Sequence, residues 1–151
     1  MALKRTVSQA NTNVNVNWLD NRGIWAWYLG MLACGWLVLT TIVEDAGLAW
    51  TYVHLLHGVV SYFLLHVSKG SPIFSEQRTD LTLWEEIDNQ TYYTKTRLFF
   101  TCIPVLLFIL ATHGTQFEKQ PLGLNLVVVV WLVLAKLPAF HKVRIMGINR
   151  Y

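Results

Sequence analysis

Charged residues in this chain are confined to short stretches that separate long apolar blocks. The block from Gly23 to Val43 carries no charge, and it exceeds the roughly 18 apolar residues that indicate a transmembrane helix. Further apolar blocks cover residues 46–67, 98–113 and 121–135. Because backbone polar groups in lipid need internal partners, such blocks are expected to be helical. The pattern predicts an all-α integral membrane protein with four transmembrane helices.

The longest polar interruption runs from Ser68 to Arg97. It holds more than half of the acidic residues of the chain: Glu76, Asp80, Glu85, Glu86 and Asp88. Charged residues make up only 14% of the whole chain, whereas soluble domains carry about 25%. We therefore expect residues 68–97 to form a water-facing loop that joins two membrane hairpins. The acidic residues beside Trp84 are expected to form a solvated or partner-binding face.

The basic residues predict the orientation of the helices. Lysines and arginines lie before the first span, in the central loop and after the fourth span, and only Lys119 lies in a turn between spans. The positive-inside rule then places both termini and the loop in the cytosol. The expected regions are a cytosolic segment 1–22, a membrane domain 23–135 and a cytosolic tail 136–151. Lys136 is expected to extend to the interface, and the two short later spans suit a thin bilayer such as the endoplasmic reticulum.

Histidines in the second block raise the question of a metal or catalytic site. His54 and His57 are three residues apart, so they share a helix face and could share an ion. We favour neutral imidazoles that hydrogen-bond to neighbouring helices or to interfacial water. No metal site, cofactor or catalytic residue is predicted. A small transporter or another membrane assembly factor remains an alternative, although no charged residue lies in the middle of a span to couple transport.

One face of the first block carries small residues at every fourth position: Ala26, Gly30 and Cys34. Small residues allow the backbones of two helices to approach closely in lipid. This face is therefore a candidate docking surface, either for the other helices of the chain or for a partner.

Several segments resemble the ORM (orosomucoid-like, ORMDL) family. They are NRGIW at 21–25, HVSKGSP at 66–72, LTLWEEID at 81–88 and KLPAFHKVRIMGIN at 136–149. The similarity runs in register from about Asn13 onward. Residues 35–38 and 141–144 are closest to the plant or algal branch. The chain departs from the family at Val14 and Met146, and it lacks the serine-bearing extension of fungal members.

The resemblance implies a regulator and not a catalyst. ORM proteins are four-helix proteins of the endoplasmic reticulum that bind the large and small subunits of serine palmitoyltransferase. They restrain this first enzyme of sphingoid-base synthesis when ceramide is plentiful. The ceramide-contacting asparagine of the family falls on Asn15, with Asn13 as its companion. The resemblance also implies ceramide contacts at Ile24 and Leu64, and a partner contact at Trp84.

Overall fold

The computed structural model describes residues 16–69, 81–117 and 119–143, and its named elements are helices. The four long helices are α1 (Arg22–Thr40), α2 (Ala46–Tyr62), α4 (Lys95–Gly114) and α5 (Lys119–Lys136). The segments Arg22–Thr40, Ala46–Val67 and Lys95–Gly114 are long and apolar enough to cross a membrane, and Pro121–Lys136 is a shorter apolar helix. The protein is thus a helical membrane protein.

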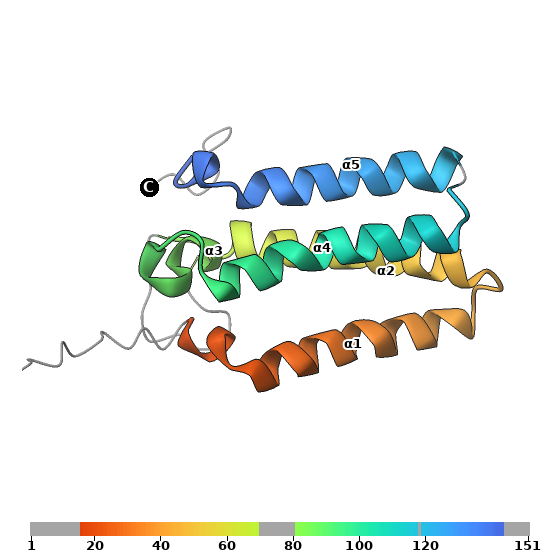
Figure 1. The fold of residues 1–151 in the computed structure, drawn as a ribbon, viewed down its shortest axis with the longest axis horizontal. Helices are drawn as coiled ribbons and strands as arrows, with labels where there is room; N and C mark the ends of the chain where they lie inside the picture. Colours follow the sequence, from red (N-terminus) through yellow and green to blue (C-terminus); the bar gives the residue numbers. More distant parts are fainter. Residues whose placement is uncertain (1–15, 70–80, 118, 144–151) are drawn as a thin grey trace, which may run out of the picture.

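The long helices lie side by side, with α2 and α4 in the centre, α1 on one flank and α5 on the other (Figure 1). The α1–α2 and α4–α5 turns lie at one end of the bundle. The short helix α3 (Leu83–Glu86), the start of α4 and the last described residues lie at the opposite end, which we call the loop end. The helices thus form two hairpins whose open ends point in the same direction.

Short polar side chains cap the helices where the apolar blocks begin. Asn21 accepts a hydrogen bond from the amide of Gly23 at 2.8 Å, and Asp45 accepts one from the amide of Gly47 at 2.6 Å. Thr94 caps α4, so this helix starts at Lys95 instead of the expected residue 98. These caps satisfy amides that the first turn of a helix leaves without partners.

The two central helices approach each other through glycines. A Cβ at Gly47 would overlap the carbonyl group of Gly114, and a Cβ at Gly114 would lie 2.9 Å from the Cα of Gly47. Small residues are the usual means by which membrane helices pack closely. This close backbone contact therefore joins α2 and α4 at the turn end.

Helix α1 packs differently, because large aromatic side chains hold it against the centre. Trp25 stacks on Phe99 with ring centroids 4.6 Å apart, and Trp36 stacks on Trp50 at 5.1 Å. No residue of α1 is fully buried. The small face of Ala26, Gly30 and Cys34 does not pack inside the described part of this chain, because all three residues are exposed.

The chain changes its helical form where α2 reaches the loop end. Residues Phe63–Val67 form a π-helical turn, in which the amide of Ser68 donates to the carbonyl of Phe63 at 2.9 Å. Beyond it, Lys69 and Thr82 form an isolated antiparallel bridge. The start of the central loop thus lies beside Thr82, and α3 packs against the π-helical turn that follows α2.

Candidate functional site

Two histidines of α2 are hydrogen-bonded to different helices. The Nδ1 atom of His54 lies 2.8 Å from Oδ1 of Asn125 in α5, and Nε2 of His57 lies 2.8 Å from the hydroxyl of Tyr28 in α1. The amide of Asn125 also donates to Thr51 at 3.0 Å. The prediction that these imidazoles bond to neighbouring helices is confirmed. Residues 16–69, 81–117 and 119–143 contain no group of three or more histidine, cysteine or acidic side chains that could hold a metal.

At the loop end, Trp84 of α3 lies between two buried cations. The guanidinium carbon of Arg97 is 5.1 Å from the centroid of the indole ring, and Nζ of Lys136 is 5.7 Å from it. Each cation also bonds to backbone carbonyls: Arg97 Nη2 donates to Ile87 at 3.1 Å, and Lys136 Nζ donates to Leu132 at 3.3 Å. Cation–π contact and charge-assisted bonds replace part of the lost hydration.

This arrangement corrects two expectations about the basic residues. Arg97 was expected in a water-facing loop and Lys136 at the interface, but each is only 5% exposed. Arg97 lies in the first turn of α4, so its side chain points along the helix and reaches the carbonyls of residues 85 and 87. Lys136 folds back on its own helix and faces Trp84 instead of extending to water.

Glu85 ties the central loop to the carboxy-terminal tail. Its Oε2 accepts the amide of Thr82 at 2.9 Å, and the hydroxyl of Thr82 accepts the amide of Glu85, so the two form a capping box. Its Oε1 accepts the amide of Lys142 at 2.8 Å. The expected solvated acidic face is therefore wrong for Glu85 and Glu86, which are both buried. The loop folds inward, and the carboxylate of Glu85 accepts backbone amides there.

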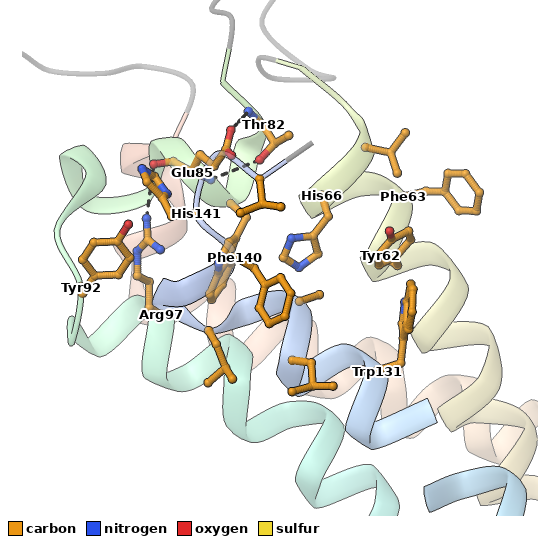
Figure 2. A pocket seen from close by; sticks show the side chains of 16 residues that line it. Tyr62, Phe63, His66, Thr82, Glu85, Tyr92, Arg97, Trp131, Phe140 and His141 are labelled. Carbon is orange, nitrogen blue, oxygen red and sulfur yellow. Dashed lines mark hydrogen bonds between the residues drawn. The ribbon is translucent and has the colours of Figure 1, made fainter. Parts of the chain in front are cut away.

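A pocket opens beside this cluster, with a volume of about 360 Å³. The close-up in Figure 2 shows Tyr62 at the end of α2, with Phe63 and His66 of the π-helical turn, on one side and Tyr92 and Arg97 on the other. Side chains near the end of α5 and from the tail complete the lining: Trp131, Leu134, Ala135, Leu137, Phe140, His141 and Val143. The pocket thus lies where the ends of three long helices meet the loop and the tail.

The predicted ceramide contacts are located only in part. Asn13 and Asn15 lie outside the described residues. Ile24 is half-buried at the start of α1, and Leu64 is 42% exposed in the π-helical turn. Val16, the first described residue, is buried in one apolar cluster that also contains Leu65. The residue after Asn15 is therefore packed against the same end of α2 that carries Leu64.

The predicted partner contacts separate into two groups. Ala26, Gly30 and Cys34 are exposed on the outer face of α1, and a Cβ at Gly30 would meet no atom within 4 Å. Trp84 is 4% exposed and belongs to the buried cluster of the loop end. The small face is open to a neighbour, whereas the indole ring offers little surface to one.

Sequence reasoning missed the functions of Arg97, Lys136 and Asn125 in packing. For the loop, a signal was present, because Thr82 and Glu85 have the Thr-x-x-Glu spacing of a capping box. That spacing indicates a folded helix start, so it argues against a freely solvated acidic stretch. The burial of Lys136 had no comparable signal, since the same residue at a helix end commonly reaches water.

Fold and site together define a small helical membrane protein whose polar groups join helices, loop and tail. Among the described residues, we find clusters joined by hydrogen bonds and cation–π contacts, and these suit assembly. Comparison with known proteins agrees with this class. The profile of the ORMDL family matches residues 13–144, and the chain belongs to this family.

Individual relatives match over almost the whole length of the chain. It is 38% identical to ORM1-like protein of Drosophila melanogaster over 143 residues, which cover 92% of this chain and 93% of that protein. It is 34% identical to ORM1-like protein 2 of Gallus gallus and 32% identical to ORM1-like protein 1 of Homo sapiens, each over 96% of this chain and 97% of the relative. Proteins of the ORMDL family are non-enzymatic regulators.

Proposed function

We propose that this chain is a regulatory subunit of serine palmitoyltransferase that restrains sphingoid-base synthesis when ceramide is plentiful. The observation that carries this proposal is the family match across residues 13–144. It includes most of the carboxy-terminal segment, in which the amide of Lys142 bonds to Glu85. A chain of this kind acts by binding the large and small subunits of the synthase, because it supplies no chemistry of its own.

We place the protein in the membrane of the endoplasmic reticulum, with four spans and both termini in the cytosol. The arrangement of the helices supports this topology, because the start of α1, the α3 region and the end of α5 lie at one end of the bundle (Figure 1). Most basic residues belong to the segments at this end, and such segments tend to stay on the cytosolic side. Asn89 starts a glycosylation sequon and would remain unmodified there.

In this proposal Asn15 contacts the ceramide head group, with Asn13 beside it and with Ile24 and Leu64 along the lipid chains. An asparagine side chain offers one acceptor oxygen and two N–H donors, so it can answer the amide and hydroxyls of ceramide together. The burial of Val16 and Leu19 supports this proposal. Both residues follow Asn15 in the chain, and they share a buried cluster with Leu65 at the loop end. Ceramide bound there would then obstruct the substrate path of the synthase.

The outer face of α1 is the proposed contact with the synthase, through Ala26, Gly30 and Cys34. Its exposure supports this, since close packing of small residues drives helix association in lipid. The proposed contribution of Trp84 is to hold α3 in place beneath a partner, because its ring is buried between Arg97 and Lys136.

The test is Asn15→Ala in the purified synthase complex, with Asn11→Ala as the matched control. We expect the Asn15→Ala complex to assemble normally but to need at least about tenfold more ceramide for inhibition. Losing a shielded hydrogen bond and leaving its partner unpaired costs about 1–3 kcal/mol, and ~1.4 kcal/mol is a factor of ten. Inhibition of both variants at the wild-type ceramide concentration would place the sensor elsewhere, and a chain that did not bind the synthase would contradict the function itself.

A further inference from the structure

The walls of the loop-end pocket are divided by chemistry. On the side of α2, α5 and the tail, the lining is mostly aromatic and aliphatic, with the imidazoles of His66 and His141 as polar groups. Phe63 and Trp131 are 57% and 53% exposed at its rim. On the side of α3 and α4, Glu85 and Arg97 face the pocket (Figure 2). The apolar rim is contributed by helices that can lie in the bilayer, and the polar wall lies at their ends. A molecule that fits both walls is amphipathic and lies at the depth of the membrane surface.

Two buried polar atoms at this pocket have no hydrogen-bond partner among the described residues. They are Nε of Arg97 and Nε2 of His66, and both side chains line the pocket. Leaving a buried donor or acceptor unpaired costs about 1–3 kcal/mol. The Arg97 atom is a donor, and the imidazole nitrogen can donate or accept. A ligand with a carbonyl oxygen and a hydroxyl can therefore satisfy both atoms.

The charge of the lining indicates a neutral ligand. Arg97 and Glu85 contribute one positive and one negative charge to the wall. Behind them, the buried side chains of Lys136 and Glu86 again contribute one charge of each sign. An anionic head group would meet the carboxylate of Glu85, and a cationic one would meet Arg97. Burying an unpaired charge beside a like charge is costly.

We propose that this pocket binds the carbonyl-and-hydroxyl end of a neutral membrane lipid, whose acyl chain lies along Phe63 and Trp131 towards the bilayer. The volume of about 360 Å³ is within the range of small-molecule pockets, about 300–1,000 Å³, so it takes the head group and the first part of a chain. An amide lipid of the ceramide type and an ester lipid of the diacylglycerol type share this chemistry. The site does not use Asn15, Ile24 or Leu64, and it does not depend on the proposed function.

The experiment uses the full-length chain without the synthase, in phosphatidylcholine nanodiscs. Photoactivatable diacylglycerol and photoactivatable ceramide are added separately, and the labelled residues are mapped by mass spectrometry. We expect at least one of the two probes to label rim residues such as Phe63, Trp131 or Phe140. Competition with unlabelled diacylglycerol and unlabelled ceramide then shows whether the ester or the amide lipid is preferred. Labelling that is confined to other surfaces would overturn the proposal.

Variants test the pocket and the polar contacts separately. Ala135→Phe fills the pocket from α5 and should reduce rim labelling at least about fivefold, whereas Ala33→Phe on the exposed face of α1 should not. His66→Phe keeps a ring but removes the nitrogen, and it should weaken labelling by about tenfold. Unchanged labelling in folded Ala135→Phe, or better competition by phosphatidic acid than by either neutral lipid, contradicts the proposal. If Ala135→Phe fails to fold, the wild-type map and His66→Phe decide.

The same assay separates this site from the proposed ceramide sensor. Asn15→Ala should leave rim labelling at the wild-type level, because Val16, the residue that follows Asn15, does not line the pocket. Loss of rim labelling in Asn15→Ala would contradict a separate site. If Asn15→Ala keeps rim labelling, the result supports a lipid site in the pocket, whatever the synthase assay shows.

Discussion

Helices α1 and α2 are neighbours in the chain and similarly apolar, yet they occupy different environments. Helix α1 buries no residue fully, whereas α2 buries small and polar ones: Gly47, Ala49, Thr51, Val53, His54, His57, Gly58 and Ser61. In a membrane, moving an apolar side chain from lipid into contact with a neighbouring helix gains little free energy. Small residues and hydrogen-bonding groups therefore decide which helix lies in the centre, and overall apolarity does not.

The largest expected effect on stability comes from adding one methyl group where the backbones of α2 and α4 meet, at Gly47 and Gly114. Gly47→Ala places a Cβ against the backbone of Gly114, which cannot rotate away as a side chain can. Overpacking costs about 1–3 kcal/mol, and we expect the upper end, measured as the free energy of unfolding in detergent. The control is Gly30→Ala on α1, where a Cβ meets nothing within 4 Å. Equal losses in both variants would show that α1 packs as closely as α2.

The second effect tests the polar core. Asn125→Leu removes the acceptor 2.8 Å from Nδ1 of His54 and the donor 3.0 Å from Thr51. Interhelical hydrogen bonds in membranes contribute on average about 0.6 kcal/mol and at most ~1.7, so we expect a loss of about 2 kcal/mol for the pair. Thr40→Val on α1 is the control, because this hydroxyl bonds only to Leu37 of its own helix. An Asn125→Leu variant as stable as Thr40→Val would mean that the polar contacts do not set the position of α2.

The sequence defines the helical membrane class, because long uncharged blocks have few alternatives in lipid. It does not show which glycine faces a neighbour. Gly30 and Gly47 both lie in blocks expected to be apolar helices, but of the two only Gly47 meets another backbone. The difference arises from the rotation of each helix, which depends on contacts between distant residues such as His54 and Asn125. A single sequence carries no direct record of such pairs.

At the loop end, the burial of charged residues likewise depends on contacts between distant residues that the sequence alone does not reveal. Near helix ends, basic residues are expected to reach water, and only the folded loop brings Trp84 between Arg97 and Lys136. The capping-box spacing of Thr82 and Glu85 predicts a local turn. It cannot predict that the second carboxylate oxygen of Glu85 accepts the amide of Lys142, because this contact joins residues far apart in the chain.

A smaller effect is expected where the hydroxyl of Tyr28 in α1 meets the imidazole of His57 in α2. Tyr28→Phe removes the hydroxyl 2.8 Å from Nε2 of His57 but keeps the ring beside Phe100, at 5.5 Å between centroids. We expect a loss of about 0.6–1 kcal/mol in the free energy of unfolding. Tyr52→Phe, at an exposed tyrosine of α2, should change it by less. If the two variants are equally stable, the hydroxyl of Tyr28 does not help to hold α1 in place.

The smallest effect on the chain itself is expected from Gly30→Leu, and here the comparison becomes a test of function. The outer face of α1 has room for the side chain, so the melting temperature of the isolated protein should stay within about 1 °C of wild type, since surface changes are mostly within ±0.5 kcal/mol.

If this face docks on a helix of the synthase, the added volume should cost about 1–3 kcal/mol of association. Recovery of the synthase in mild detergent should then fall roughly tenfold, because ~1.4 kcal/mol is a factor of ten in affinity. Gly123→Leu is the matched control on the exposed face of α5, where a Cβ also meets nothing within 4 Å. Full recovery with Gly30→Leu would mean that this face contacts lipid, and an equal loss with Gly123→Leu would mean that α5 docks as well.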